Sequence, residues 1–306
     1  MTTHPTRALS ALSRTWLLVP GAHPGAHAAA LDSSCDVVVA DLEEMTAPHD
    51  RPRARELIVA LLENARARGA LGAVRINRME EDGPTDLEGI MPGRPHAVFL
   101  PHAETPEQMS ALDTALTVME TRFGIAPGAT GIVPTIESAR GLVRLASLLA
   151  ASPRIRYCML ASEDLAASLG AWRTPQGDEL RYARSRFLLE TRGAGCQPID
   201  LPCTYRSPAV LAHDLEVARQ LGFRSKCAVF VEHVDAIQRA FTPSMADAHA
   251  AQALVDAHRA QSVDGSSQYD ERWIDAPEAN NARRTLERHA LCERLQNPQH
   301  RPDGVA

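Results

Sequence analysis

The stretch that decides the fold is Gly131-Ile-Val-Pro-Thr-Ile-Glu-Ser-Ala-Arg-Gly141, in which a short apolar run ends abruptly at the carboxylate of Glu137. A second stretch, Tyr157-Cys-Met-Leu-Ala-Ser-Glu-Asp-Leu165, has the same form and ends at Glu163 and Asp164. Short apolar runs without alternation are typical of strands covered on both faces, as in parallel sheets. We therefore expect each of these acids to lie at the carboxyl end of a buried strand.

Runs of this kind recur eight times before the composition changes near residue 244. They cover residues 15–19, 36–40, 72–76, 96–100, 131–136, 156–160, 197–201 and 226–231. Helical periodicities fill intervals between them, at 53–68, 106–122, 138–151, 179–194 and 208–221. Eight β/α units in about 240 residues predict an α/β fold, the (β/α)8 TIM barrel, over residues 14–244. A doubly wound open sheet is the alternative, but no GxGxxG follows the first run.

The pattern changes after Phe241-Thr-Pro-Ser244. A helical stretch at 245–261 leads through a polar loop, 262–272, to Trp273-Ile-Asp275 and then to another helix at 277–295. We expect residues 245–296 to form a C-terminal helical extension of the barrel, because they are too few for a domain of their own. Residues 1–13 and 297–306 are expected to be flexible tails.

Composition and charge exclude several classes of protein. The formal charge of −6 over 306 residues argues against a nucleic-acid binder, which has to neutralise phosphates. Residues 1–13 contain no apolar signal region, and no segment approaches the roughly 20 apolar residues of a membrane span. The six cysteines form no CxxC pair, which favours buried, reduced thiols. We therefore expect a cytoplasmic, soluble protein without a nucleic-acid or membrane partner.

Polar side chains follow most of the apolar runs, where a TIM barrel places its chemistry. They are Asp41, Glu43, Arg75, Asn77, His102, Glu137, Glu163 and Asp164. Several carboxylates at one barrel mouth repel one another unless a cation neutralises them, and two carboxylates with waters and substrate oxygens suit Mg²⁺. This favours Glu137 and Asp164 as metal ligands. Taken singly, each acid could instead balance a helix dipole or cap a helix.

Arg75 lies inside an apolar run, where an unpaired charge is costly. Two explanations are open, and each can hold at a different stage. Arg75 either pairs with an acid such as Glu43 or binds a substrate carboxylate through its planar guanidinium group.

With these residues placed, the chain resembles the citrate lyase β-subunit-like group of the HpcH/HpaI aldolase superfamily, which includes malyl-CoA and citramalyl-CoA lyases. The resemblance covers roughly residues 14–244 and returns at Trp273-Ile-Asp275. It rests on several motifs in order, which are Leu17-Leu-Val-Pro-Gly21, Asp36-Val-Val-Val-Ala-Asp-Leu-Glu-Glu44, Val74-Arg-Ile-Asn77, Ile136-Glu-Ser-Ala-Arg-Gly141, Glu163-Asp-Leu165, Tyr182-Ala-Arg-Ser-Arg186 and Phe241-Thr-Pro-Ser244.

The resemblance implies a carbon-carbon lyase that acts on a 3-hydroxyacyl-CoA. It implies Mg²⁺, with Mn²⁺ as a substitute, held by Glu137 and Asp164, and Arg75 on a carboxylate or carbonyl oxygen of the substrate. It further implies that Asp275 is the catalytic acid or base and reaches the active site of a neighbouring subunit as part of a lid. A homo-oligomer, a trimer or hexamer, follows from the same resemblance.

Three departures from the family's pattern bear on the substrate. Leu100-Pro-His102 stands where the family has L-P-K, so that a fixed cation is replaced by a side chain that can be neutral at pH 7. The eighth run ends in Val229-Phe-Val-Glu-His233 rather than I-H-P, and the loop 21–27 has no basic residue besides histidine. Fewer cations weaken the case for coenzyme A. Glu43 and His102 are candidate substrate contacts, and His102 could equally be a hydrogen-bonded loop residue.

Several functions therefore stay open. The favoured one is a Mg²⁺-dependent lyase, or the reverse condensation, acting on malyl-, citramalyl- or citryl-CoA. The nearest alternative is a superfamily aldolase that acts on a free 2-oxo acid such as pyruvate without coenzyme A. A thioester hydrolase is compatible with the same residues. A non-catalytic subunit of a larger assembly is disfavoured because Glu137, Asp164, Arg75 and Asp275 are all present.

Overall fold

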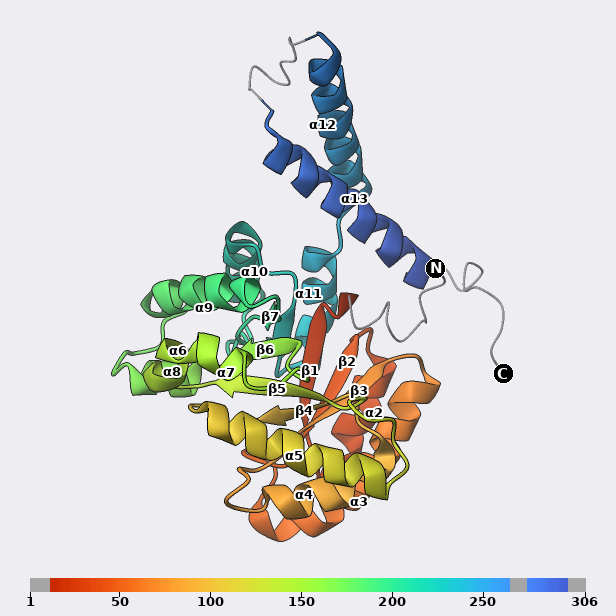
Figure 1. Ribbon diagram of the computed structural model, residues 1–306, viewed down its shortest axis with the longest axis vertical. Helices are drawn as coiled ribbons and strands as arrows, with labels where there is room; N and C mark the ends of the chain where they lie inside the picture. The colour runs from red at the N-terminus through yellow and green to blue at the C-terminus, as the bar shows by residue number, and fades with distance from the viewer. Residues whose placement is uncertain (1–11, 265–273, 297–306) are drawn as a thin grey trace. The chain divides into compact units, whose positions relative to one another are not determined.

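The computed structural model describes residues 12–264 and 274–296 (Figure 1). Residues Ser13–Gln238 form one compact unit, and Met1–Leu12 with Arg239–Ala306 form a second. Each unit is described by itself below. Three segments lie outside the described residues. They are residues 1–11, residues 265–273, which include most of the predicted polar loop and Trp273, and the predicted tail at 297–306.

Eight parallel strands make up the sheet of the first unit. They are β1 (Thr15–Pro20), β2 (Val37–Asp41), β3 (Leu71–Arg75), β4 (Ala97–Leu100), β5 (Gly131–Ile136), β6 (Tyr157–Leu160), β7 (Gln197–Ile199) and β8 (Lys226–Ala228). Their order is β7-β6-β5-β4-β3-β2-β1-β8, and a parallel bridge between Asp200 and Lys226 joins the two outer strands. The predicted TIM barrel is confirmed. The last two strands are shorter than their apolar runs, and the eighth run ends in a 3₁₀ turn at Val231–His233.

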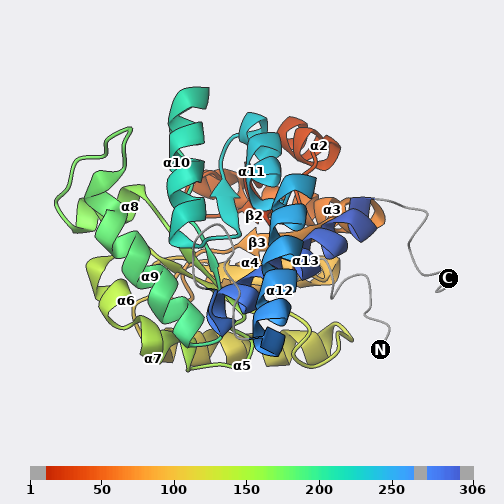
Figure 2. The same cartoon turned by 90° about the horizontal axis from the view of Figure 1, so that it is seen from above.

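Helices encircle the strands, as the view from above shows (Figure 2). In the first unit they are α2 (Pro24–Asp32), α3 (Arg51–Ala67), α4 (Gly83–Ile90), α5 (Pro106–Arg122), α6 (Ala139–Val143), α7 (Leu145–Leu149), α8 (Glu163–Ser168), α9 (Arg181–Gly193) and α10 (Pro208–Leu221), with 3₁₀ turns at Pro48–Asp50, Met91–Gly93, Asp178–Leu180 and Val231–His233. The helix predicted at 138–151 is broken at Arg144. There the backbone N–H and the hydroxyl of Ser147 both bind the Arg144 carbonyl, at 3.0 and 2.7 Å, in a tight turn.

Three aromatic side chains pack against one another between the strands. The ring of Trp16 on β1 lies 5.6 Å from that of Phe99 on β4 and 5.0 Å from that of Tyr157 on β6, both edge to face. Trp16 is fully buried, and its indole N–H donates to Ser225 Oγ at 2.9 Å. In a chain with only 4% aromatic residues, these rings join strands that are not neighbours in the sheet.

The barrel closes at the seam between β7 and β8, where side chains repeat the backbone pairing. Asp200 and Lys226 form the backbone bridge, and the Lys226 Nζ also lies 2.8 Å from Asp200 Oδ2. Arg184 of α9 binds both Asp200 oxygens, at 2.7 and 2.5 Å, and lies 2.8 Å from Asp214 of α10. Lys226 reaches Asp214 at 2.5 Å. These four residues, Arg184, Asp200, Asp214 and Lys226, are called the seam cluster. Each of its two cations pairs with both of its carboxylates.

The second unit is helical where it is described. Helix α11 (Val234–Phe241) crosses its boundary, and α12 (Met245–Asp264) and α13 (Ala276–Gln296) pack together. Their contact is built on Ala251, Val255 and Ala282, with Leu254 and Leu286 beside them. Among the described residues, no helix is both long and apolar enough to cross a bilayer.

Candidate active site

The carboxyl ends of β2 and β3 carry a buried ion pair at the barrel mouth. Asp41 and Arg75 are the last residues of these strands and are partners in the strand register. The Nε and Nη2 atoms of Arg75 each donate to one oxygen of Asp41, both at 2.7 Å. Asp41 also accepts the backbone N–H groups of Glu43 and Met45, at 3.0 and 2.8 Å. The guanidinium group is therefore held in one orientation.

Two further acids approach the other side of Arg75. Its Nη1 lies 3.0 Å from Glu43 Oε2, and its Nη2 lies 3.7 Å from Glu44 Oε2. Burial alone would lower the pKa of Arg75, but the charges of Asp41 and Glu43 outweigh burial and raise it. The predicted pairing of Arg75 with Glu43 is confirmed, although Asp41 is the stronger partner.

His102 follows β4 and lies between two carboxylates. Its Nδ1 is 2.9 Å from Glu137 Oε2, and its Nε2 is 3.6 Å from Glu43 Oε1. Contacts with Glu137 and Glu43 raise the pKa of His102 to about 10, against the opposing effect of burial. Since the side chain is then protonated at neutral pH, His102 supplies a positive charge there, and the neutral side chain considered from the sequence is not what these surroundings produce.

Glu137 stands at the end of β5, directly before Ser138, whose hydroxyl caps α6 by accepting the Gly141 N–H at 3.0 Å. The Glu137 side chain is only 2% exposed. Its Oε2 accepts both the backbone N–H and the ring Nδ1–H of His102. Glu137 Oε1 accepts no hydrogen bond from the described residues. Because Ser138 is the cap, Glu137 is not needed to cap this helix.

The two acids that follow β6 have different surroundings. Glu163 is exposed and accepts hydrogen bonds from Thr204 at 2.7 Å and from Arg173 at 3.2 Å. Asp164, in the first turn of α8, is half-buried, and its carboxylate makes no hydrogen bond or ion pair with any described residue. Burial and the charge of Glu43 raise the pKa of Glu44, and Asp164 and Glu137 act on it in the same direction. Asp164 and Glu137 therefore both lie close enough to Glu44 to act on its charge.

These side chains form one group, the mouth cluster, which consists of Asp41, Glu43, Glu44, Arg75, His102, Glu137 and Asp164. Five of them are carboxylates and two are cations. The excess of negative charge, the unpartnered Asp164 carboxylate and the oxygen-only donors fit a hard divalent cation such as Mg²⁺. In the described part of the chain, no three His, Cys, Asp or Glu side chains gather in a ready-made metal cage. Mg²⁺ commonly takes only one or two carboxylates and completes its shell with water and substrate.

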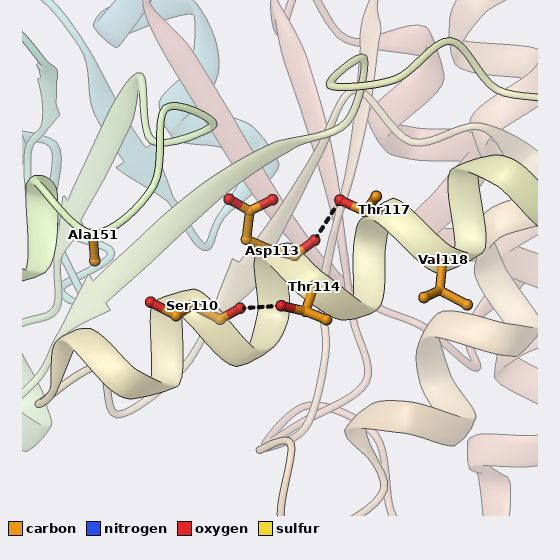
Figure 3. Close-up of a pocket in the computed structure, with 6 residues that line it drawn as sticks. All are labelled: Ser110, Asp113, Thr114, Thr117, Val118 and Ala151. Carbon is orange, nitrogen blue, oxygen red and sulfur yellow. Dashed lines mark hydrogen bonds between the residues drawn. The ribbon is translucent and has the colours of Figure 1, made fainter.

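A shallow hollow of about 470 Å³ lies elsewhere, on the outer surface of α5 (Figure 3). Ser110, Thr114 and Thr117 line it, and each hydroxyl donates to the carbonyl four residues earlier in the helix. Asp113 is bound by Ser152 and Arg154, both at 2.6 Å. Because these polar groups already have partners, the hollow offers no chemistry comparable with that of the mouth cluster.

The remaining predicted residue, Asp275, belongs to the second unit. Its exposed side chain caps α13 by accepting the Glu278 N–H at 2.9 Å. Its catalytic role stays a prediction. All six cysteines are buried thiols rather than members of disulfides, as the sequence predicted.

Sequence reasoning missed the parts that Asp41 and Glu44 play. Asp41 was recognised as a polar residue at the mouth, but not as the partner that orients Arg75. A signal was present, because both residues end adjacent strands of equal length and so face each other in register. Glu44 gave no such signal, since its position depends on how the loop after β2 turns.

The chain is similar to a known family and to several characterised proteins. The HpcH/HpaI aldolase/citrate lyase family matches residues 14–229. The citrate lyase subunit beta of Escherichia coli (strain K12) is 28% identical over 91% of this chain and 93% of that protein. The L-malyl-CoA/beta-methylmalyl-CoA lyase of Rhodobacter capsulatus is 27% identical over 86% of this chain and 90% of that protein.

Among solved structures, CitE from Mycobacterium tuberculosis, in complex with magnesium, acetoacetate and coenzyme A, superposes with a TM-score of 0.72. It is 27% identical, and the match covers 90% of this chain and 97% of that one. The family match spans well over half of the 306 residues and includes every residue of the mouth cluster. This chain therefore belongs to the HpcH/HpaI aldolase/citrate lyase family.

Proposed function

We propose that this protein is a Mg²⁺-dependent carbon-carbon lyase that cleaves, or in reverse forms, a 3-hydroxyacyl-CoA such as malyl-, citramalyl- or citryl-CoA. The lyase class follows from family membership. The observation that carries the proposal is the mouth cluster, in which an excess of carboxylates surrounds a rigidly held guanidinium group. This combination suits a substrate that is itself anionic and is joined to the protein by a cation.

Glu137 and Asp164 would hold the Mg²⁺. When bound, the cation lowers the pKa of a hydroxyl group and polarises a carbonyl, as metal ions do in many lyases and hydrolases. The magnesium complex of the M. tuberculosis relative supports Mg²⁺ as the cation. Mn²⁺, which also accepts oxygen ligands, would substitute for it.

Arg75 would bind a carboxylate or carbonyl oxygen of the substrate. Asp41 already fixes its Nε and Nη2, so the remaining N–H groups have a defined direction before the substrate arrives. Preorganised donors of this kind stabilise developing charge without reorganising during the reaction. Glu43 and His102, which lie beside Arg75 and Glu137, would contact the substrate at the same side of the site.

Cleavage would begin with transfer of the proton of the 3-hydroxyl group to solvent. The bond between C2 and C3 then breaks, C3 becomes the carbonyl carbon of a 2-oxo acid, and the electron pair passes to the thioester enolate. Protonation of C2 completes the acyl-CoA, and we assign that proton to Asp275 as general acid. In the condensing direction, Asp275 would remove the same proton.

An aldolase that acts on a free 2-oxo acid is the second candidate. The observation in its favour is that no Lys or Arg occurs between Arg14 and Arg51, a segment that includes the loop after β1 and helix α2. The phosphates of coenzyme A need cationic partners, and this segment supplies none.

The deciding experiment incubates the purified protein with malyl-, citramalyl- or citryl-CoA, or with free 2-oxo acids and aldehydes, in Mg²⁺ or EDTA. Mass spectrometry follows thioesters, free coenzyme A and oxo acids. We expect Mg²⁺-dependent release of an acyl-CoA and an oxo acid, lost in Asp275→Asn. Turnover of free oxo acids alone would favour the aldolase, and release of free coenzyme A would indicate a hydrolase.

A further inference from the structure

The loop between β4 and α5 has a backbone conformation that few residues adopt. His102 has a φ of 50°, in the left-handed region that residues with a Cβ atom rarely enter. A non-glycine residue in this region costs of the order of 1–3 kcal/mol and persists only where its surroundings require it. Such strain occurs frequently at functional sites, and here it lies beside the predicted metal ligand Glu137.

The surroundings hold this loop from several sides. The His102 carbonyl accepts from Gln108 Nε2 at 3.4 Å, and Gln108 Oε1 accepts the N–H groups of Glu104 and Thr105 at 2.8 and 3.0 Å. Ala103 donates its N–H to the Thr135 carbonyl at 3.2 Å. On the far side, a Cβ atom at Gly141 would come within 2.5 Å of the Ala103 carbonyl oxygen, so only glycine allows this approach. The loop is thus fixed against both α5 and the start of α6.

The unusual conformation directs two donors of one residue to one acceptor atom. The backbone N–H of His102 is 2.9 Å from Glu137 Oε2, and its ring Nδ1 is 2.9 Å from the same oxygen. Because Glu137 Oε1 accepts nothing from the described residues, the two oxygens of this buried carboxylate have different environments. One accepts two hydrogen bonds from His102, and the other has no partner among the described residues.

We propose that His102 is a positioning residue for the metal ligand, which occupies one oxygen of Glu137 so that the carboxylate presents the other to the cation. This inference rests on the proposed function, since it requires that Glu137 binds Mg²⁺. It concerns the neutral or protonated ring equally, because both forms can carry a proton on Nδ1. Removal of a partner that orients a metal ligand in this way typically weakens metal binding about 10- to 100-fold.

The test measures Mg²⁺ affinity by isothermal titration calorimetry in the substrate-free protein, so its result does not depend on turnover. His102→Gly keeps both the left-handed backbone and its N–H donor, and removes only the ring. His102→Asn also tolerates this backbone, and its side-chain amide can donate from close to the position of Nδ1. Glu137→Gln serves as the reference for loss of the ligand itself. Unfolding curves in EDTA establish that each variant is folded.

We expect Mg²⁺ to bind His102→Gly at least about 10-fold more weakly than wild type, and His102→Asn within about 3-fold of it. Unchanged affinity in His102→Gly would overturn the inference, and so would an equal loss in both His102 variants, because a donor at that position would then not suffice. If the wild type binds Mg²⁺ no better than Glu137→Gln does, the proposed function fails as well, so the two failures are distinguishable.

Discussion

The barrel holds two groups of buried or half-buried charges, and they differ in how those charges balance. In the seam cluster, Arg184 and Lys226 face Asp200 and Asp214, so positive and negative charges are equal in number. In the mouth cluster, five carboxylates share two cations, and Asp164 pairs with neither. Both clusters include residues at the ends of strands of the same sheet, and each contains an arginine that donates two hydrogen bonds to one aspartate.

This difference separates structural from functional charge. A neutral cluster satisfies itself, because burial of each ion is offset by its partners within the protein. A cluster with surplus negative charge is satisfied only by something that binds to it. The seam cluster should therefore determine how stably the barrel closes, and the mouth cluster should determine what it binds. Changes in one cluster should therefore alter stability, and changes in the other should alter binding and catalysis.

The largest effect is expected at the seam. Lys226→Met leaves Asp200 and Asp214 with one cation between them, in a site where the lysine side chain is fully buried. Breaking a buried ion pair from one side costs about 3–5 kcal/mol, so we expect urea unfolding to report a loss of that size. Arg68→Met, which removes an exposed pair with Asp32, is the control and should cost less than about 1 kcal/mol. Equal losses in the two variants would contradict the structural role of the seam.

The next effect belongs to the mouth. Saturating Mg²⁺ at about 100 times its Kd should stabilise the wild type by about 2.7 kcal/mol, and Glu137→Gln should abolish this gain. Glu163→Gln is the matched control, since Glu163 lies next to Asp164 in the first turn of α8 but is exposed and bound by Arg173 and Thr204. Thermal unfolding with and without Mg²⁺ measures both variants. A Mg²⁺ response that survives Glu137→Gln would place the cation elsewhere.

A third change keeps the charge of the mouth but alters its geometry. Arg75→Lys retains a cation but cannot reproduce the two parallel hydrogen bonds to Asp41 or their fixed direction. We expect kcat/KM to fall about 30-fold, which corresponds to about 2 kcal/mol. Steady-state kinetics on the thioester identified by mass spectrometry would test this. Full activity in the lysine variant would mean that charge alone suffices at this position.

The smallest effect should come from relieving repulsion in the mouth cluster. Burial and neighbouring carboxylates raise the pKa of Glu44 in the folded state. An acid whose folded pKa is raised loses stability as the pH rises through that pKa, so Glu44→Gln should be more stable than wild type at pH 7. Because Glu44 is 58% exposed and screened by solvent, we expect only about 0.3 kcal/mol.

Two conditions should remove this gain. Below about pH 4 both the folded and unfolded wild type carry a protonated Glu44, so the two curves should meet. Salt at about 0.5 M should shrink the difference because it screens exposed charges. Chemical unfolding at several pH values provides the measurement, and a destabilised Glu44→Gln at pH 7 in low salt would show that the mouth cluster is not overcharged.

The sequence predicted the barrel and most of the mouth, because both depend on local patterns. Short apolar runs mark strands, and the residue that follows each strand has its position determined by the barrel itself. Glu137, Arg75 and Glu43 could be brought together on this basis. The charge of His102 could not be predicted, since it depends on two carboxylates that come from other strands.

Long-range side-chain partners could not be predicted from the hydrophobic pattern either. Arg184 was noticed only as part of a motif, and its partners come from β7 and α10, 16 and 30 residues further along the chain. The break in the predicted helix at Arg144 lies where the Ser147 hydroxyl shares the Arg144 carbonyl with backbone N–H groups, a contact that periodicity does not reveal. The left-handed backbone of His102 gave no usable signal either, because only a small share of histidines adopt it, even though they do so more often than most residues.

Burial of the seam lysine also bears on whether thioesters can acylate this protein. Lys226 is the only lysine in the sequence, and its amine is enclosed in the folded barrel. Thioesters acylate free amines, whereas guanidinium groups stay protonated and do not attack them. A folded chain of this kind therefore presents no lysine nucleophile to the thioesters it is proposed to handle. Amine-directed labels and cross-linkers should reach Lys226 only after β7 and β8 separate, so that their rate of reaction reports the opening of the barrel.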